Sequence, residues 1–251
     1  MTFPEIPELS ASIKPFLKRT EWGEFPDVII HAEEVVVKKH PAYVAAKGGD
    51  SDAAEALILE AAPIGALDKI SAALGEARPH LLAVHALETE GMNAIPQVFA
   101  GLLSKLLDLP VSRGILQINR VTHTGADGYH RLAFPALFDG EAREKEYYIV
   151  DDFIGQGGTL ANLKGFVESH GAKVLGATTL TGKAYSAKLR LEEATLQELR
   201  SKYGTDLEQW WTDTFGYGFE RLTKSEARYL LRSGDAERIT TRLAAAFTDR
   251  N

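Results

Sequence analysis

The sequence predicts an α/β protein with a parallel central sheet, and three observations lead to this prediction. Apolar runs of strand length alternate with segments of helical spacing through residues 81–180. Glycine or proline often stands where one pattern gives way to the next. The runs are continuously apolar, which is typical of strands that are buried on both faces. Strands that alternate with helices in this way form crossover units, and such units build parallel sheets.

Four strands and two helices are expected in this alternating region. We expect strands over residues 81–86, 111–118, 147–150 and 173–180, and helices over residues 96–107 and 160–167. Pro110 would end the first helix, and Gly171 would close the second. Because ligands of parallel sheets bind beyond the carboxyl ends of the strands, the functional residues are expected there.

The N-terminal part of the chain reads as an irregular arm followed by short helices. The first 35 residues hold four of the ten prolines. A strand-like run lies at residues 28–30, and a second lies at 35–37. Residues 50–77 are predicted to form two short helices that break at Pro63. Asp52 and Glu55 give the first of these helices a capping pattern.

The C-terminal residues 188–251 are predicted to be helical and charged. Their aromatic side chains gather at residues 210–219, and we interpret this cluster as packing core rather than as a surface that stacks on a base. We therefore divide the chain into an N-terminal hood or flank (1–78), a core (79–187) and a C-terminal helical segment (188–251).

Composition and charge exclude several classes of protein. The 28 Lys and Arg residues against 35 Asp and Glu residues give a net charge of −7, which argues against a chain-wide surface for nucleic acid or an anionic membrane. The absence of cysteine excludes disulfide scaffolds, cysteine metal sites and a cysteine nucleophile. No secretory signal pattern opens the chain, and no stretch approaches 18 uninterrupted apolar residues. We expect a cytoplasmic protein.

Residues 147–160 carry the clearest chemical signal. An apolar strand leads into the adjacent carboxylates of Asp151 and Asp152, and a glycine-rich turn then opens a helix. Backbone N–H groups at such a turn bind anions, so a phosphate and a polyhydroxylated or metal-bound group are the natural joint ligand. The turn is no Walker loop because Gly-Lys-Ser/Thr is missing, and it lacks the third glycine of a dinucleotide fingerprint.

This segment resembles the signature of the type I phosphoribosyltransferases, in which an aliphatic strand is followed by two acids, two mostly apolar residues and a short Thr/Gly-rich loop. The resemblance implies that Asp151 and Asp152 contact the ribose hydroxyls of phosphoribosyl pyrophosphate (PRPP). It further implies that the loop binds the 5-phosphate through Gly155, Gln156, Gly157, Gly158 and Thr159. The core would then have the parallel sheet of that family.

The resemblance extends over about residues 79–183. Residues 87–91 look like the family's pyrophosphate loop, which implies that Thr89, Glu90 and Gly91 bind PRPP. Because the acidic side chains of this loop would repel a diphosphate, Mg²⁺ is expected as a cofactor, and the resemblance places it on Asp151 and Asp152. Gly155 stands where purine-using members often carry an acid, which argues against a hypoxanthine- or guanine-type enzyme. We also expect a homodimer.

The polar stretch between the second and third predicted strands corresponds to a loop that closes over the diphosphate in this family. The resemblance therefore implies catalytic roles for Arg120 and Arg131, and Arg113, His123 and His130 lie in or beside the same stretch. A solvated loop with chance basic residues is the alternative interpretation. We interpret His85, at the end of the first strand, as a core residue.

Three functions remain open at this point. The first is transfer of a 5-phosphoribosyl group from PRPP to a nitrogenous base with release of pyrophosphate. The second is a non-catalytic regulator that senses PRPP or a nucleotide with the same pocket. The third is an unrelated α/β phosphate binder, because a fold does not fix a function.

Overall fold

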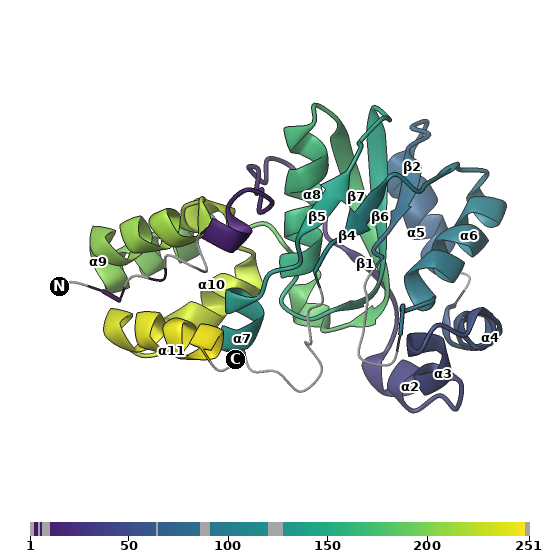
Figure 1. The fold of residues 1–251 in the computed structure, drawn as a ribbon. Helices are drawn as coiled ribbons and strands as arrows, with labels where there is room; N and C mark the ends of the chain where they lie inside the picture. Colours follow the sequence, from purple (N-terminus) through teal and green to yellow (C-terminus); the bar gives the residue numbers. More distant parts are fainter. Residues whose placement is uncertain are drawn as a thin grey trace.

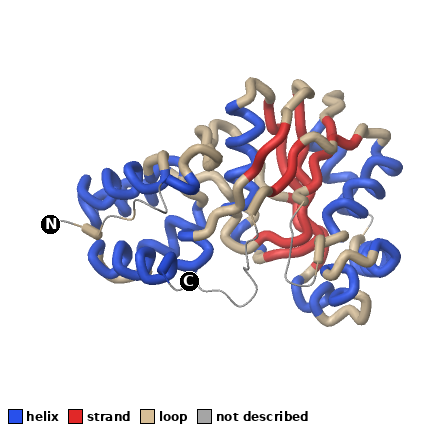
Figure 2. The backbone as a smooth tube through the Cα atoms, in the orientation of Figure 1, coloured by secondary structure: helices blue, strands red, loops and turns tan. Residues whose placement is uncertain are grey.

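The computed structural model describes residues 3, 4, 6, 11–63, 65–85, 91–119 and 128–248. Its centre is a five-stranded sheet with helices on both faces, which confirms the predicted α/β class (Figures 1 and 2). The strand order is β1-β7-β6-β2-β3, and all four pairings are parallel. The strands are β1 (Ile29–Ala32), β2 (His80–Ala83), β3 (Val111–Ser112), β6 (Glu146–Ile154) and β7 (Lys173–Gly182).

The prediction of one strand over residues 111–118 is wrong. The run is divided between β3 and β4 (Ile115–Gln117), and β4 pairs with β5 (Phe138–Gly140) in a separate antiparallel ribbon. The division falls at Gly114, where a Cβ atom would lie 2.8 Å from the carbonyl oxygen of Glu141. Two backbones approach closely at this point, which only glycine allows, and the chain leaves the main sheet there.

The two short helices expected in the N-terminal flank and the two expected in the alternating region are present. They are α4 (Ser51–Ala61), α5 (Gly65–Leu74), α6 (Ile95–Leu107) and α8 (Gly158–Ser169). The first of them is capped by Asp50 rather than by Asp52, because the Asp50 side chain accepts hydrogen bonds from the backbone N–H groups of Asp52 and Ala53. Within the described ranges, no helix combines the length and the hydropathy needed to cross a bilayer.

The strand-like run at residues 35–37 is instead helical. It lies in α2 (Glu34–Lys38), which is followed by α3 (Tyr43–Lys47). Three consecutive valines favour a strand locally, but only Val37 is buried, whereas Val35 and Val36 are exposed. One turn of helix buries Val37 against the core and leaves the other two valines exposed. Tertiary packing therefore overrides the local preference of valine for a strand.

The central strand β6 is buried on both faces. Its side chains alternate: Tyr147 and Ile149 pack in the cluster that contains Phe166 of α8, and Tyr148 and Val150 pack in the cluster that contains Phe99 of α6. The strand runs beyond its predicted end, so both Asp151 and Asp152 belong to it.

A helical lobe lies beside the sheet (Figure 1). It comprises α7 (Gly128–Ala133), α9 (Glu193–Phe215), α10 (Lys224–Leu231) and α11 (Ala236–Thr248). Its core contains the aromatic cluster, with Trp211, Phe215 and Phe219 fully buried, so these rings are packing core as expected. Segments cross the expected divisions of the chain, since β1 joins the sheet by pairing with β7 and α7 packs against α11.

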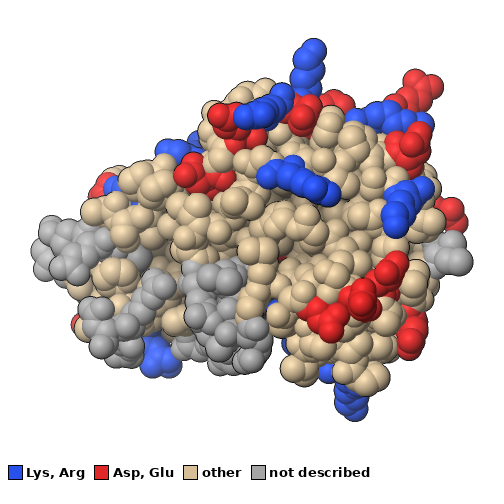
Figure 3. All heavy atoms as spheres, turned by 45° about the vertical axis from the view of Figure 1, so that its right-hand side comes forward, with Lys and Arg blue, Asp and Glu red and all other residues tan. Residues whose placement is uncertain are grey.

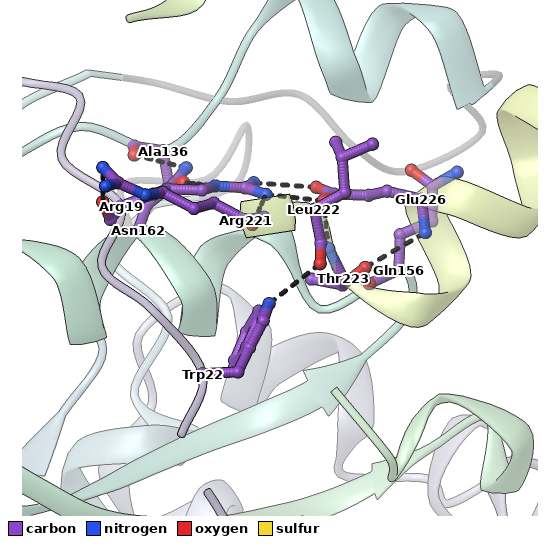
Figure 4. Close-up of polar contacts among 9 residues, drawn as sticks. All are labelled: Arg19, Trp22, Ala136, Gln156, Asn162, Arg221, Leu222, Thr223 and Glu226. Carbon is purple, nitrogen blue, oxygen red and sulfur yellow. Dashed lines mark hydrogen bonds and ion pairs between the residues drawn. The ribbon is translucent and has the colours of Figure 1, made fainter. Parts of the chain in front are cut away.

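A buried ion pair joins the N-terminal segment to the helical lobe. The Arg19 guanidinium donates to Glu226 at 2.6 and 2.8 Å and, through Nε, to Asn162 Oδ1 of α8 at 2.8 Å (Figure 4). Although burial alone would lower it, the pKa of Arg19 is raised because Glu226 stabilises the charge. Trp22 supports the junction by donating from Nε1 to the carbonyl oxygen of Leu222 at 2.9 Å.

We predict that Glu226→Ala lowers the free energy of unfolding by about 3–5 kcal/mol, because it leaves the buried Arg19 charge without its partner. Chemical denaturation measures this change. In the control, Glu141→Ala breaks an ion pair with Arg143 whose side chains are 69% and 76% exposed, and it should cost less than about 1 kcal/mol. Equal losses in the two variants would contradict a stabilising role for the buried pair.

Candidate functional site

The candidate site lies where the order of the strands reverses. From β2 the chain passes through α6 to β3 on one side, whereas β6, on the other side of β2, leads on through α8 to β7. Such a switch point opens a crevice at the carboxyl ends of its two strands. A cavity of about 310 Å³ lies here, lined by Val84 beyond β2 and by Asp151 and Asp152 on β6.

The two carboxylates form a buried acid pair. Asp151 is 6% exposed and Asp152 is 8% exposed, and the backbone N–H of Asp152 donates to Asp151 Oδ1 at 2.8 Å. Burial, followed by the neighbouring charge of Asp152, raises the pKa of Asp151 well above its usual range. A site that holds two carboxyl groups this close favours a ligand that brings positive charge or hydrogen-bond donors.

Lys47 is the partner of the acid pair. Its Nζ atom lies 3.0 Å from Asp152 Oδ2, and both side chains are mostly buried. Lys47 is the last residue of α3, so this contact ties α3 to the end of β6. No motif in the sequence points to Lys47, because it ends a short helix in the N-terminal flank and meets Asp152 only through the fold.

The glycine loop, residues 155–159, carries the chain from β6 into α8. Gly157 adopts a left-handed conformation with φ of +83° at the N-cap position, and no side chain caps the helix there. The backbone N–H groups of the first helical turn are therefore left to another acceptor, and the positive end of the helix dipole favours an anion. This arrangement fits the predicted phosphate site.

The glycines of the loop accommodate protein side chains. A Cβ atom on Gly155 would lie 2.9 Å from the Arg131 guanidinium, and one on Gly157 would lie 2.2 Å from Leu189. Thr223 Oγ1 donates to the backbone oxygen of Gln156 at 2.6 Å, which ties the loop to the start of α10 (Figure 4). The loop is thus held from outside by the helical lobe.

Besides the acid pair, the charged lining of the cavity comprises a third acid, Glu226, which pairs with Arg19, and four basic side chains. The basic side chains are Arg19, Lys38, Lys47 and Arg131. Among them only Arg131 was predicted as a site residue, and α7 brings it over the glycine loop. The other three come from the N-terminal flank, whose sequence carries no motif for this chemistry.

Other predicted site residues divide into three groups. All residues of the glycine loop line the cavity, Gln156 and Thr159 included. Gly91 does not line it; its φ is +138°, and a Cβ atom there would lie 2.6 Å from the carbonyl oxygen of Gly48. Outside the described residues lie Glu88, Thr89, Glu90, Arg120 and His123.

Two further candidate residues, Arg113 and His85, lie away from the cavity lining. Arg113 is exposed in the turn between β3 and β4. His85 is half-buried, and burial, together with the charge of Arg113, lowers its pKa. Neither residue lines the cavity that holds the acid pair, so neither adds to the site.

The acid pair has the chemistry of a magnesium site. Within the part of the chain that the structure describes, no group of three or more His, Cys, Asp or Glu side chains is placed to hold a metal. Mg²⁺ is commonly held by one or two carboxylates, with substrate oxygens and water completing the shell. Asp151 and Asp152 meet that requirement, and a phosphorylated substrate would supply the remaining oxygens.

No family model matches the chain. It is 35% identical over 230 residues to protein TraN of Escherichia coli, a match that covers 91% of this chain and 51% of TraN. It is 40% identical over 151 residues to an uncharacterized protein of Haemophilus influenzae, which covers 59% of this chain and 34% of that protein. The chain thus spans about half, or less, of the length of these curated relatives.

Solved adenine phosphoribosyltransferases are also similar to the structure. The Saccharomyces cerevisiae enzyme is 14% identical, with a TM-score of 0.34 over 72% of this chain and 92% of that chain. The Leishmania donovani enzyme is 12% identical, with a TM-score of 0.33 over 79% of this chain and 75% of that chain. Similarity at this level carries no argument about the function of this chain.

Proposed function

We propose that this chain binds PRPP and transfers its 5-phosphoribosyl group to a nitrogenous base with release of pyrophosphate. One observation supports the proposal above all: a buried acid pair and an uncapped helix N-terminus lie one short loop apart at the switch point of a parallel sheet. Carboxylates accept hydrogen bonds from a ribose diol, and the helix N-terminus takes a phosphate. A ribose 5-phosphate carries both groups.

In the proposed reaction, Asp151 and Asp152 accept hydrogen bonds from the ribose hydroxyls and stabilise the positive charge that develops at the anomeric carbon. The glycine loop holds the 5-phosphate and so orients the ring. The lone pair of the base nitrogen forms the new bond to the anomeric carbon, the bond to the diphosphate oxygen breaks, and its electrons leave with pyrophosphate. A proton on that nitrogen passes to solvent.

Cations around the cavity suit the leaving group. The guanidinium of Arg131 lies at the glycine loop, and Lys47 lies beside Asp152, so positive charge stands close to where negative charge would grow. When bound to the acid pair, Mg²⁺ would neutralise the charge of the diphosphate. A homodimer, a cytoplasmic location and dependence on Mg²⁺ remain predictions of this proposal.

A regulator that senses PRPP or a nucleotide is the second candidate. It is favoured by the hydrogen bond from Thr223 to Gln156, since that bond couples the glycine loop directly to the helical lobe. Occupancy of the loop would then change how the lobe is held, without any turnover. The two candidates share the binding site, but only the enzyme goes on to release pyrophosphate.

The acid pair should lower stability in the free protein. Burial and the neighbouring charge of Asp152 raise the pKa of Asp151 in the folded state above its value in the unfolded chain. The folded state therefore binds the proton more tightly, and the free energy of unfolding falls as the pH rises from the unfolded pKa to the folded pKa. We therefore expect Asp151→Asn to unfold at a higher temperature than the parent at pH 7, by at least about 2 °C, and at nearly the same temperature near pH 4.

Thermal unfolding followed by circular dichroism at the two pH values measures this difference. Asp206→Asn, at an exposed position of α9, is the matched control and should show no such dependence. If Asp151→Asn were less stable than the parent at pH 7, Asp151 would be a structural carboxylate.

Asp151→Asn combined with Asp152→Asn should weaken PRPP binding by more than about tenfold, because two charge-assisted hydrogen bonds of about 1.5–3 kcal/mol each are lost. Calorimetric titration with PRPP and Mg²⁺ measures the affinity, and Asp206→Asn again serves as control. A folded double variant that binds PRPP as tightly as the parent would rule out the ribose role.

Turnover separates the enzyme from the sensor. For an enzyme, Arg131→Ala should lower the rate of pyrophosphate release far more than it lowers PRPP affinity, since its contact would be strongest in the transition state. A panel of purine, pyrimidine and pyridine bases provides the assay, with Arg143→Ala as the exposed control. If PRPP binds and no base releases pyrophosphate, the sensor is the correct assignment.

A further inference from the structure

A second cavity of about 560 Å³ adjoins the first one. The two share the wall formed by Lys38, Arg131, Phe153, Gly155 and Gln156. The second cavity extends from there to residues just beyond β7 and to α10. A ligand in it would lie against the same glycine loop as a ribose phosphate in the first cavity.

The second cavity is strongly basic. Its lining includes one acidic side chain, Glu34, and five basic ones: Lys38, Arg131, Lys183, Arg228 and Arg232. This concentration stands out in a chain of net charge −7. On the face that Figure 3 presents, basic side chains do not gather in this way, and a run of acidic side chains lies at the lower right. Like charges gathered in one hollow favour an anionic ligand.

Two of these cations are not balanced by an acid within the described chain. Glu34 forms ion pairs with both lysines, Lys38 and Lys183. Arg228, by contrast, donates to two neutral acceptors, the carbonyl oxygen of Tyr185 at 3.1 Å and Ser225 Oγ at 3.0 Å. Among the described residues, none forms an ion pair or a hydrogen bond with the Arg232 guanidinium. The α10 end of the cavity therefore carries the uncompensated positive charge.

Aromatic rings complete the lining. Lys38 Nζ lies 4.5 Å from the centroid of the Phe153 ring, and the Arg228 guanidinium lies 5.0 Å from the centroid of the Tyr185 ring. Tyr229 lies on α10 in the same lining. Each cation covers one face of its ring, and the aromatic side chains make the lining of the cavity partly apolar. The cavity thus offers a partly apolar surface together with a basic end.

We propose that the second cavity binds the acceptor base, and that this base carries an anionic group, carboxylate or phosphate, which pairs with Arg228 and Arg232. The inference rests on the proposed function for the identity of the neighbouring ligand, and it goes beyond that function by assigning the class of base. An anionic group contacts guanidinium through charge-assisted, often bidentate hydrogen bonds, which a neutral base cannot form.

Matched pairs of bases test the proposal. Calorimetry on the full chain would compare orotate with uracil, and nicotinate with nicotinamide, each with and without PRPP and Mg²⁺. We expect the acidic member of at least one pair to bind at least about tenfold more tightly than its neutral partner. Inorganic phosphate, added as a competitor, distinguishes a general anion site from one that accepts carboxylate only. Equal binding of acidic and neutral members in both pairs would overturn the inference.

Substitution of Arg228 and Arg232 tests whether these two side chains cause the preference for acidic bases. Arg228→Gln combined with Arg232→Gln should abolish the preference for the acidic base and leave PRPP affinity within about twofold of the parent. The charge-matched control combines Arg143→Gln with Arg238→Gln, two exposed positions outside the cavity, and should keep the preference. If the double variant unfolds, Arg232→Gln alone, at a position where the side chain is not buried, should still reduce the preference.

The outcomes also separate this inference from the proposed function. If PRPP binds and the preference for acidic bases is absent or survives the double variant, the inference is wrong, and the proposed function is decided separately by the assay of pyrophosphate release. If acidic bases bind through Arg228 and Arg232 but PRPP does not bind, the cavity is an anion site as inferred, and the phosphoribosyltransferase proposal fails.

Discussion

The buried contact between Arg19 and Glu226 is the interaction on which the site depends. It joins three parts of the chain, because Arg19 also donates to Asn162 of α8 and Glu226 belongs to the capping box of α10. The same α10 start supplies Thr223, which holds the glycine loop through Gln156. Burying two charges is favourable only when their partners are in place, so the ion pair requires this one arrangement of segments.

Basic side chains near the acid pair offset part of the cost of burying its two carboxyl groups. The acid pair is buried and Asp151 holds its proton more tightly than usual, which is unfavourable for the free protein. Lys47 offsets part of this cost, and Arg131 adds positive charge at the glycine loop. Buried groups with shifted pKa values that line a cavity are typical of functional sites, where stability is given up for binding. In the second cavity, the basic side chains would likewise be stabilised by an anionic ligand, which we propose to be the acceptor base.

The local parts of this picture could be predicted from sequence, and the nonlocal parts could not. The strand, the acids and the glycine loop lie within residues 147–160, so their pattern alone predicted β6, the turn and α8. Lys47 and Lys38 reach the site from segments far away in the chain, and no local pattern marks them. The three valines of α2 predict a strand by their local preference, and that prediction is wrong. Their burial depends on tertiary packing, about which a few neighbouring residues in the sequence carry no information.

The most direct test of the central claim is a titration of the full chain with PRPP and Mg²⁺, followed through the backbone amide signals of the glycine loop by nuclear magnetic resonance. We expect the signals of residues 155–159 to shift or to become protected from hydrogen exchange in a saturable way, because their N–H groups would donate to the 5-phosphate. Saturable binding that leaves these amides unchanged, or no binding at millimolar PRPP, would contradict it.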